Sequence, residues 1–238
     1  MLKLKWPLSA ACFAVFPIAC SKPAPTETAQ QPPPAPPAPK IYVSDEVAGD
    51  ISIIDSASFG GPNVDESTLP PPDHSADGTV SVIDTAAGKV LKTVQVGRRP
   101  RNVVFMPDVK HAYVNAENDG AIGYLDTVKN VPIKTIVPGK PGVMKPMGMA
   151  LSADASKLYV STGRGKMVFI IDTATNQPVT SFEVGQRPRG VALSTDGKIL
   201  YSANGPSNNV SVVDLATSAV LKKVPVGDGP WGVIVLAP

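Results

Sequence analysis

Basic residues flank a proline that recurs along the chain, at Pro100, Pro146, Pro188 and Pro230. In the first three copies an Arg or Lys stands beside this proline, and in the fourth a Trp follows it. The residues concerned are Arg99, Arg101, Lys145, Arg187, Arg189 and Trp231. Arg donates hydrogen bonds in a planar fork that matches carboxylate and phosphate groups, and Trp can stack on a planar ligand or on an Arg. These six residues are the predicted binding site for an anionic small molecule or a partner protein.

A purely structural role would account for the same residues. The cationic side chains could pair with Glu117, Asp119 or Asp228 on neighbouring loops or stay solvated, while Pro and Gly shape the turns. The sequence alone leaves both interpretations open.

Motifs that would support catalysis are few. The chain contains no HExxH, GxSxG, paired-cysteine or phosphate-loop pattern. Asp65, Glu66, Asp73 and His74 could in principle collect a divalent cation, although acidic loops are usually solvated. His111 could be an axial haem ligand, or a surface residue that forms an ordinary hydrogen bond. We therefore predict no catalytic residue, no metal and no cofactor, and we expect a protein that is not an enzyme.

The elements that must position the basic residues follow from an internal repeat. Four segments end in a similar way, at "TVSVIDTA", "AIGYLDTV", "MVFIIDTA" and "NVSVVDLA", and their aspartates are Asp84, Asp126, Asp172 and Asp214. The steps between them are 42, 46 and 42 residues. Since Asp favours turns and accepts backbone hydrogen bonds there, we interpret each of these aspartates as a turn residue.

Each repeat contains four short segments that are typical of strands. In the last full repeat these are "RGVALS", "ILYSA", "VSVVDLA" and "VLKKVPV", each rich in Val, Ile, Leu or Tyr and bounded by turn residues. Four strands in about 42 residues is the pattern of a β-propeller blade. The predicted fold is therefore all-β, a propeller of about four four-stranded antiparallel blades. In such blades the loops before the first strand and after the second emerge on one face.

These residues also carry a family resemblance. "IYVSDE", "AYVNAE" and "LYVSTG", together with "VSVIDT", "GRRPRNV" and "GDGPWGV", resemble the YVTN-type repeats of secreted bacterial propellers. The chain is similar in particular to propeller proteins associated with PQQ-dependent catabolism, over nearly all of residues 40–238. The resemblance implies an accessory role near periplasmic quinoprotein oxidation. It also implies about seven blades, whereas this chain has about four repeats.

The last repeat contains a first strand with nothing after it, at residues 231–236. We predict that this strand closes the ring by pairing with N-terminal strands at "KIYVSDE", "VSVIDT" and "VLKTVQV". Residues 58–77 would then be an inserted loop in the closing blade, or a scar where blades were lost. A further alternative is that two chains share one larger ring as a homodimer.

The N-terminal part differs from the repeats. Lys3 and Lys5 precede a short apolar run, which is typical of a secretory signal, and "PIAC" resembles a lipoprotein cleavage site that would lipidate Cys20. A plain cleaved signal or an uncleaved anchor are the alternatives. We therefore predict a signal peptide at 1–20, a Pro-rich linker at 21–39 and a propeller domain at 40–238.

The predicted location excludes some partners. Removal of Lys3 and Lys5 reduces the 22 basic residues to 20, which balance the 20 acidic ones, so a nucleic-acid partner is not expected. We predict a lipoprotein of the bacterial envelope that faces the periplasm, in the outer membrane rather than the inner one. The predicted function is non-catalytic binding of a partner protein or anionic small molecule. A lactonase-like hydrolase is the alternative.

Overall fold

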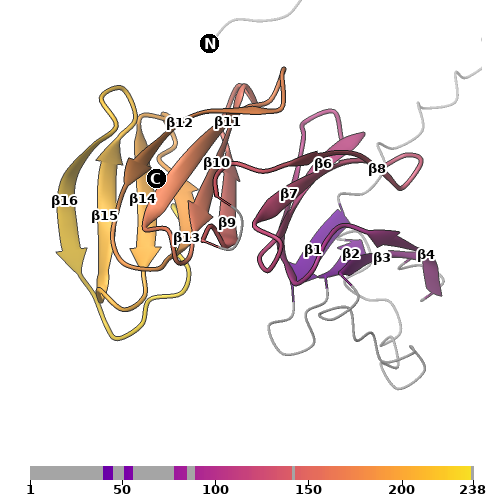
Figure 1. Ribbon diagram of the computed structural model, residues 1–238, viewed down its shortest axis with the longest axis horizontal. Helices are drawn as coiled ribbons and strands as arrows, with labels where there is room; N and C mark the ends of the chain where they lie inside the picture. Colours follow the sequence, from indigo (N-terminus) through magenta and orange to yellow (C-terminus); the bar gives the residue numbers. More distant parts are fainter. Residues whose placement is uncertain (1–39, 45–50, 56–77, 85–88, 141–142, 237–238) are drawn as a thin grey trace, which may run out of the picture. The chain divides into compact units, whose positions relative to one another are not determined.

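A computed structural model describes residues 40–44, 51–55, 78–84, 89–140 and 143–236, and every regular element among them is a β-strand (Figure 1). The chain divides into two compact units, Met1–Pro37 and Ala38–Pro238, and the described residues all belong to the second. The predicted signal, Cys20, the linker and the 58–77 loop lie outside the described residues.

Three complete blades make up most of the described chain. In each, four consecutive strands form an antiparallel sheet in simple meander order. The first blade contains β5 (Pro100–Phe105), β6 (His111–Ala116), β7 (Ala121–Asp126) and β8 (Val131–Ile136). The second contains β9 (Pro146–Leu151), β10 (Lys157–Thr162), β11 (Met167–Asp172) and β12 (Gln177–Glu183). The third contains β13 (Pro188–Leu193), β14 (Ile199–Asn204), β15 (Asn209–Asp214) and β16 (Ala219–Pro225). The predicted all-β fold of four-stranded blades is confirmed.

The hydrophobic core lies between the blades. The second strands are almost fully buried, with Tyr113 and Leu158 fully enclosed, because a neighbouring blade covers each side of them. A cluster that contains both residues joins the first blade to the second, and another that contains Tyr159 and Leu200 joins the second to the third. The fourth strands are mostly exposed, which is why their sequences mix Lys and Thr with Val.

The repeated aspartates shape the turns between the third and fourth strands. The Oδ1 atom of Asp126 accepts hydrogen bonds from the backbone N–H groups of Val128 and Lys129, and that of Asp172 accepts from Thr175. The backbone hydrogen bond from Lys129 is the main cause that lowers the pKa of Asp126. Asp214 accepts in the same way from Ala216, so the interpretation as turn residues is confirmed for Asp126, Asp172 and Asp214.

The first strands of the three blades lie side by side and are joined by buried polar side chains. Asn115 accepts the backbone N–H of Arg101 at 2.9 Å and donates through Nδ2 to the carbonyl of Met147 at 2.6 Å. Ser161 does the same between the next two blades, because its hydroxyl contacts both the Gly148 backbone and the Arg189 carbonyl. Gly148 has no room for a Cβ, since that atom would overlap the Arg189 carbonyl oxygen. The inner strands are therefore held at fixed spacing.

The N-terminal strands form two separate two-stranded sheets. β1 (Lys40–Ser44) pairs with β2 (Ile51–Asp55), and β3 (Thr79–Asp84) pairs with β4 (Lys89–Gln95). β2 lies beside β3, and Val80 and Val94 pack against the first blade. These strands do not form the ladder predicted between "KIYVSDE" and "VSVIDT".

The predicted closure by residues 231–236 is not present in the described part of the chain, where these residues belong to no strand. Trp231 does lie where the first strand of a further blade would begin, because its carbonyl accepts the N–H of Gly190 at 2.9 Å. The pairing of β3 with β4 agrees with the predicted order of "VSVIDT" and "VLKTVQV", whereas β1 pairs with β2, its nearest neighbour in sequence, and not with β3.

Candidate anion-binding site

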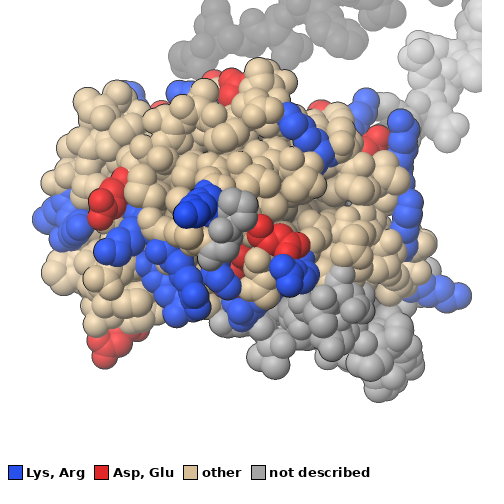
Figure 2. Space-filling model, viewed as in Figure 1, with Lys and Arg blue, Asp and Glu red and all other residues tan. Residues whose placement is uncertain are grey.

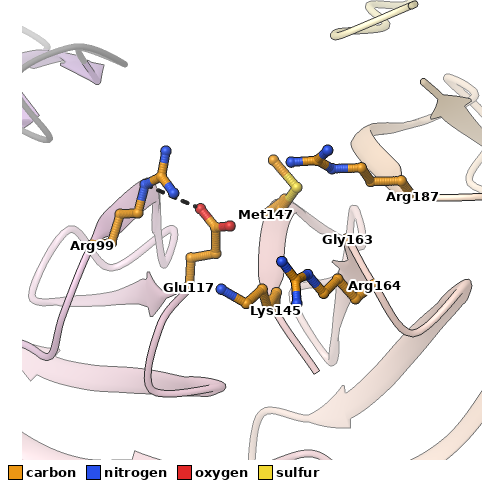
Figure 3. A pocket seen from close by; sticks show the side chains of 7 residues that line it. All are labelled: Arg99, Glu117, Lys145, Met147, Gly163, Arg164 and Arg187. Carbon is orange, nitrogen blue, oxygen red and sulfur yellow. Dashed lines mark ion pairs between the residues drawn. The ribbon is translucent and has the colours of Figure 1, made fainter. Parts of the chain in front are cut away.

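Four cationic side chains from three blades surround one small polar pocket of about 70 Å³ (Figure 3). The pocket is lined by Arg99, Glu117, Lys145, Met147, Gly163, Arg164 and Arg187. Arg99, Lys145 and Arg187 lie just before the first strands of the blades, and Glu117 and Arg164 follow second strands. The two sets of loops meet on one face, as the propeller topology predicts.

The residue before the repeated proline lines this pocket in the first three copies, as Arg99, Lys145 and Arg187. Arg99 and Arg187 adopt a left-handed backbone, with φ of 59° and 50°. Gly229 occupies the equivalent place in the last repeat with φ of 60°. A non-glycine residue in this conformation costs free energy, so the two arginines stand at positions where the backbone alone would favour Gly.

Glu117 connects the pocket to the inner strands. Its Oε2 atom accepts a hydrogen bond from Arg101 Nε at 2.6 Å and lies 3.5 Å from Arg99 Nε. The Glu117 side chain is 4% exposed and the Arg101 side chain 10%. This carboxylate therefore fixes both guanidinium groups, one in the pocket and one beneath it.

Trp231 is at the centre of a second group that does not line the pocket. The guanidinium carbon of Arg189 lies 3.5 Å from the centroid of the indole, and that of Arg101 lies 6.0 Å away. Trp231 is 40% exposed. These contacts are cation–π interactions, which the sequence analysis gave as one role for Trp231.

The structure therefore divides the six predicted residues into two groups. Arg99, Lys145 and Arg187 line the pocket, while Arg101, Arg189 and Trp231 interact with Glu117 or with each other. Residues two apart in a regular strand would project to the same side, but Arg99 and Arg187 lie before the strands in a left-handed backbone, so their side chains leave in another direction than those of Arg101 and Arg189. The six are not a single continuous binding surface.

Sequence reasoning missed Arg164 and gave Glu117 only a pairing role. Both follow a second strand, at "AENDG" and "TGRGK", in loops that the propeller topology places on the same face as the recurring proline. A search for charged residues in those loops would have found Arg164. Lys145 meets one of these loops directly, because its Nζ donates to Asn118 Oδ1 at 3.0 Å.

Two of the predicted pairing partners bind elsewhere. Asp119 contacts Arg98 with 2.7 Å between Oδ1 and Nε. Burial raises the pKa of Asp119, but the hydrogen bonds and charge of Arg98 outweigh it, so the pKa lies below its ordinary value. Asp228 accepts a hydrogen bond from Asn208 at 2.8 Å. Glu117 is thus the carboxylate that lines the pocket among the described residues.

The other candidate site residues are His111 and the group in the 58–77 segment. His111 Nδ1 lies 2.7 Å from Asp108 Oδ2, and the imidazole stacks on Tyr124 at 5.3 Å between centroids. Asp65, Glu66, Asp73 and His74 lie outside the described residues. Within the part of the chain that is described, no three His, Cys, Asp or Glu side chains are grouped as metal ligands would be.

On the face seen in Figure 2 most of the surface is uncharged; Lys and Arg lie near the centre beside a small acidic group, and others lie at the left and right edges. In the described segments, no helix has the length and apolar character that crossing a membrane requires.

The chain resembles known proteins both in its sequence family and in its fold. The family model for "Lactonase, 7-bladed beta-propeller" matches residues 80–229. Hydrazine synthase of Kuenenia stuttgartiensis has a similar structure, with a TM-score of 0.59 and 22% sequence identity over 76% of this chain and 50% of that one. A candidate 6-phosphogluconolactonase of Bacteroides fragilis matches with a TM-score of 0.50 and 25% identity over 56% of this chain and 41% of that one. The chain thus spans half or less of these two proteins. No curated protein matches its sequence.

Proposed function

The chain belongs to the lactonase family of seven-bladed β-propellers, and on that premise we propose that it binds a small carboxylate- or phosphate-bearing molecule. The ligand lies between Arg99, Lys145, Arg164 and Arg187. The observation that carries this proposal is the convergence of four cationic side chains from three blades on one pocket. Cationic donors that surround a polar pocket suit an anion with several oxygen atoms.

The backbone at two of these positions supports the same function. Arg99 and Arg187 remain in a left-handed conformation that Gly adopts more easily. Strained backbone is common at functional sites, where the surrounding structure holds it in place, and it also occurs between strands of this chain at residues such as Val109 and Ala155. The guanidinium groups are the feature of these residues that a ligand would use.

The test is calorimetric titration of the full chain with inorganic phosphate and with citrate. The double variant Arg164→Ala with Arg187→Ala should lose at least about tenfold in affinity, because each lost charged hydrogen bond costs about 1.5–3 kcal/mol. The matched control is Lys222→Ala with Lys223→Ala, which removes two positive charges from exposed positions on the outer strand β16. Equal losses in both double variants would mean that the pocket is not the site and that only net charge matters.

Lactone hydrolysis is the second candidate function, and the family match supports it. Hydrolysis adds water to the lactone carbonyl, breaks the ring ester bond and releases a hydroxy acid. The cations of the pocket could stabilise the negative charge that develops on the carbonyl oxygen, and Glu117 could accept a proton from the attacking water. Its Oε2 already accepts a hydrogen bond from Arg101, so this proton would go to Oε1.

Turnover separates the two functions. Under the binding proposal, purified protein hydrolyses a panel of sugar lactones no faster than buffer does. Hydrolysis that disappears in Glu117→Gln while the fold is retained would favour the enzyme instead.

The cellular setting is part of the proposal as well. We place the propeller in the bacterial envelope through a lipid on Cys20, with residues 21–39 as the spacer. The YVTN-type repeats and the similarity to PQQ-associated propellers support an accessory role in periplasmic oxidation. The partner is a periplasmic protein or the anionic ligand itself, and a second copy of the chain is a further possible partner.

A further inference from the structure

The pocket contains a carboxylate among its cations, and this combination restricts the anion that fits. We infer that the proposed anion site selects a ligand that carries its own hydroxyl hydrogen, such as hydrogen phosphate or a hydroxy acid, over an anion without one. The inference rests on the proposed function, because it concerns the same pocket. Its basis is the position and contacts of Glu117.

Glu117 is held in place through its Oε2 atom, and its Oε1 atom can still accept a hydrogen bond. Both guanidinium contacts reach Oε2, from Arg101 at 2.6 Å and from Arg99 at 3.5 Å. The backbone N–H of Glu117 also donates to the Arg99 carbonyl at 3.0 Å, which anchors the start of the loop. An ionised carboxylate has about four lone-pair sites, so Oε1 can accept from a ligand. Figure 3 shows the carboxylate on the same side of Met147 as Arg99 and Lys145.

Cations alone would not distinguish between oxyanions of equal charge. Arg99, Lys145, Arg164 and Arg187 can only donate hydrogen bonds, and every oxygen of sulfate or phosphate accepts them. Glu117 can only accept while it is ionised. Among the side chains that line the pocket, the Glu117 carboxylate is therefore the acceptor that can favour a hydroxyl hydrogen.

The carboxylate favours one kind of anion and rejects the other. Hydrogen phosphate donates its O–H to Oε1 while its remaining oxygens accept from the cations. Sulfate has no hydrogen to donate, so an oxygen of sulfate would face the Glu117 carboxylate with like charge. A buried acceptor without its hydrogen bond costs free energy, and like charges at short range add to that cost. Low exposure of the Glu117 side chain, 4%, keeps water from compensating fully.

The experiment compares matched ligands on the full chain by calorimetric titration at about pH 8, where hydrogen phosphate and sulfate carry nearly equal charge. Phosphate should bind at least about tenfold more tightly than sulfate, and malate more tightly than succinate, which lacks the hydroxyl. In Glu117→Gln the phosphate-to-sulfate ratio should fall to about one, because an amide can donate to either anion. The control variant Asp119→Asn removes a carboxylate that pairs with Arg98 and does not line the pocket, so its ratio should equal that of the wild type.

The outcomes separate the selectivity from the binding function. Equal affinity of the wild type for phosphate and sulfate would overturn the selectivity and leave anion binding standing. If neither anion binds, the proposed function fails and the selectivity fails with it. The wild-type comparison decides the matter even if Glu117→Gln does not fold, and a ratio that survives in a folded Glu117→Gln would also overturn it.

Discussion

Replacing Arg99 and Arg187 with glycine should weaken anion binding without weakening the fold. The two residues have φ of 59° and 50°, and the last repeat already has Gly229 at the equivalent place with φ of 60°. The chain therefore provides its own example of the substitution. The prediction distinguishes what the side chains do from what the backbone requires.

The expected stability follows from three opposing effects. Replacing a left-handed Arg with Gly removes backbone strain of about 1–2 kcal/mol at each position. Gly loses more entropy on folding, which costs about 0.5–1 kcal/mol at each. The loss of the Arg99 contact with Glu117, at 3.5 Å and with the arginine 38% exposed, costs at most about 0.5 kcal/mol after solvent screening. The stability of the double glycine variant should therefore lie between about 0.5 kcal/mol below and about 2.5 kcal/mol above that of the wild type.

Alanine at the same positions provides the comparison. Arg99→Ala with Arg187→Ala removes the same guanidinium groups but keeps a Cβ in the left-handed region, so it should be less stable than the glycine pair by about 1–2 kcal/mol. Both double variants should lose affinity for phosphate by about a hundredfold, because two charged hydrogen bonds are lost at about 1.5–3 kcal/mol each and the remaining cations recover a part.

Urea unfolding measures the stability of the two variants, and calorimetric titration measures their affinity. A glycine pair that is less stable than the alanine pair would refute the reasoning about backbone strain. Unchanged affinity in both pairs would show that Arg99 and Arg187 do not contact the anion.

Three further predictions concern the fold and its anchoring. Asn115→Ala should destabilise the protein by about 3 kcal/mol in urea unfolding, because it leaves buried backbone groups of two blades without partners. Alanine itself fits at this place of a blade, since Ala203 occupies the equivalent place in the third blade. Acid should reduce the stability of the wild type through Asp154. The pKa of this residue is lowered from an ordinary 3.8 to about 2, mainly by the hydrogen bond from the Ser152 hydroxyl. Because the folded pKa is the lower one, this stability is present above about pH 4 and is lost as pH falls toward about 2, so Asp154→Asn should flatten the pH profile of the melting temperature over that range. Cys20→Ser should abolish incorporation of labelled palmitate and release the protein from membranes, and labelling that persists would contradict lipidation at this residue.

The repeat in the sequence was sufficient to predict the blades. Strand segments, the turn aspartates and the common face of the loops all follow from local patterns, and hydrogen bonds within four-residue turns enforce them. Arg99, Lys145 and Arg187 were found in the same way, since they stand at the same place in each repeat. Local rules operate identically in every blade, so a periodic sequence reveals them.

The role of each basic residue was not visible in the sequence. Arg101 and Arg189 have the same residue type and spacing as the pocket arginines, yet one is held by Glu117 and the other by Trp231. Arg164 has no basic counterpart in the other repeats, so the periodic pattern did not single it out. The direction of a side chain and the loop it meets in the next blade determine such roles.

The sequence by itself determined the strands, the blades and the face on which chemistry gathers, because these depend on contacts between residues close in the chain. Only the tertiary structure decided which cations share a pocket, that Glu117 lies among them, and that Trp231 stacks on Arg189. It also decided that β1 pairs with β2 and not with β3. These features join residues of different blades, or choose between strands of nearly identical sequence, and no local pattern distinguishes among such partners.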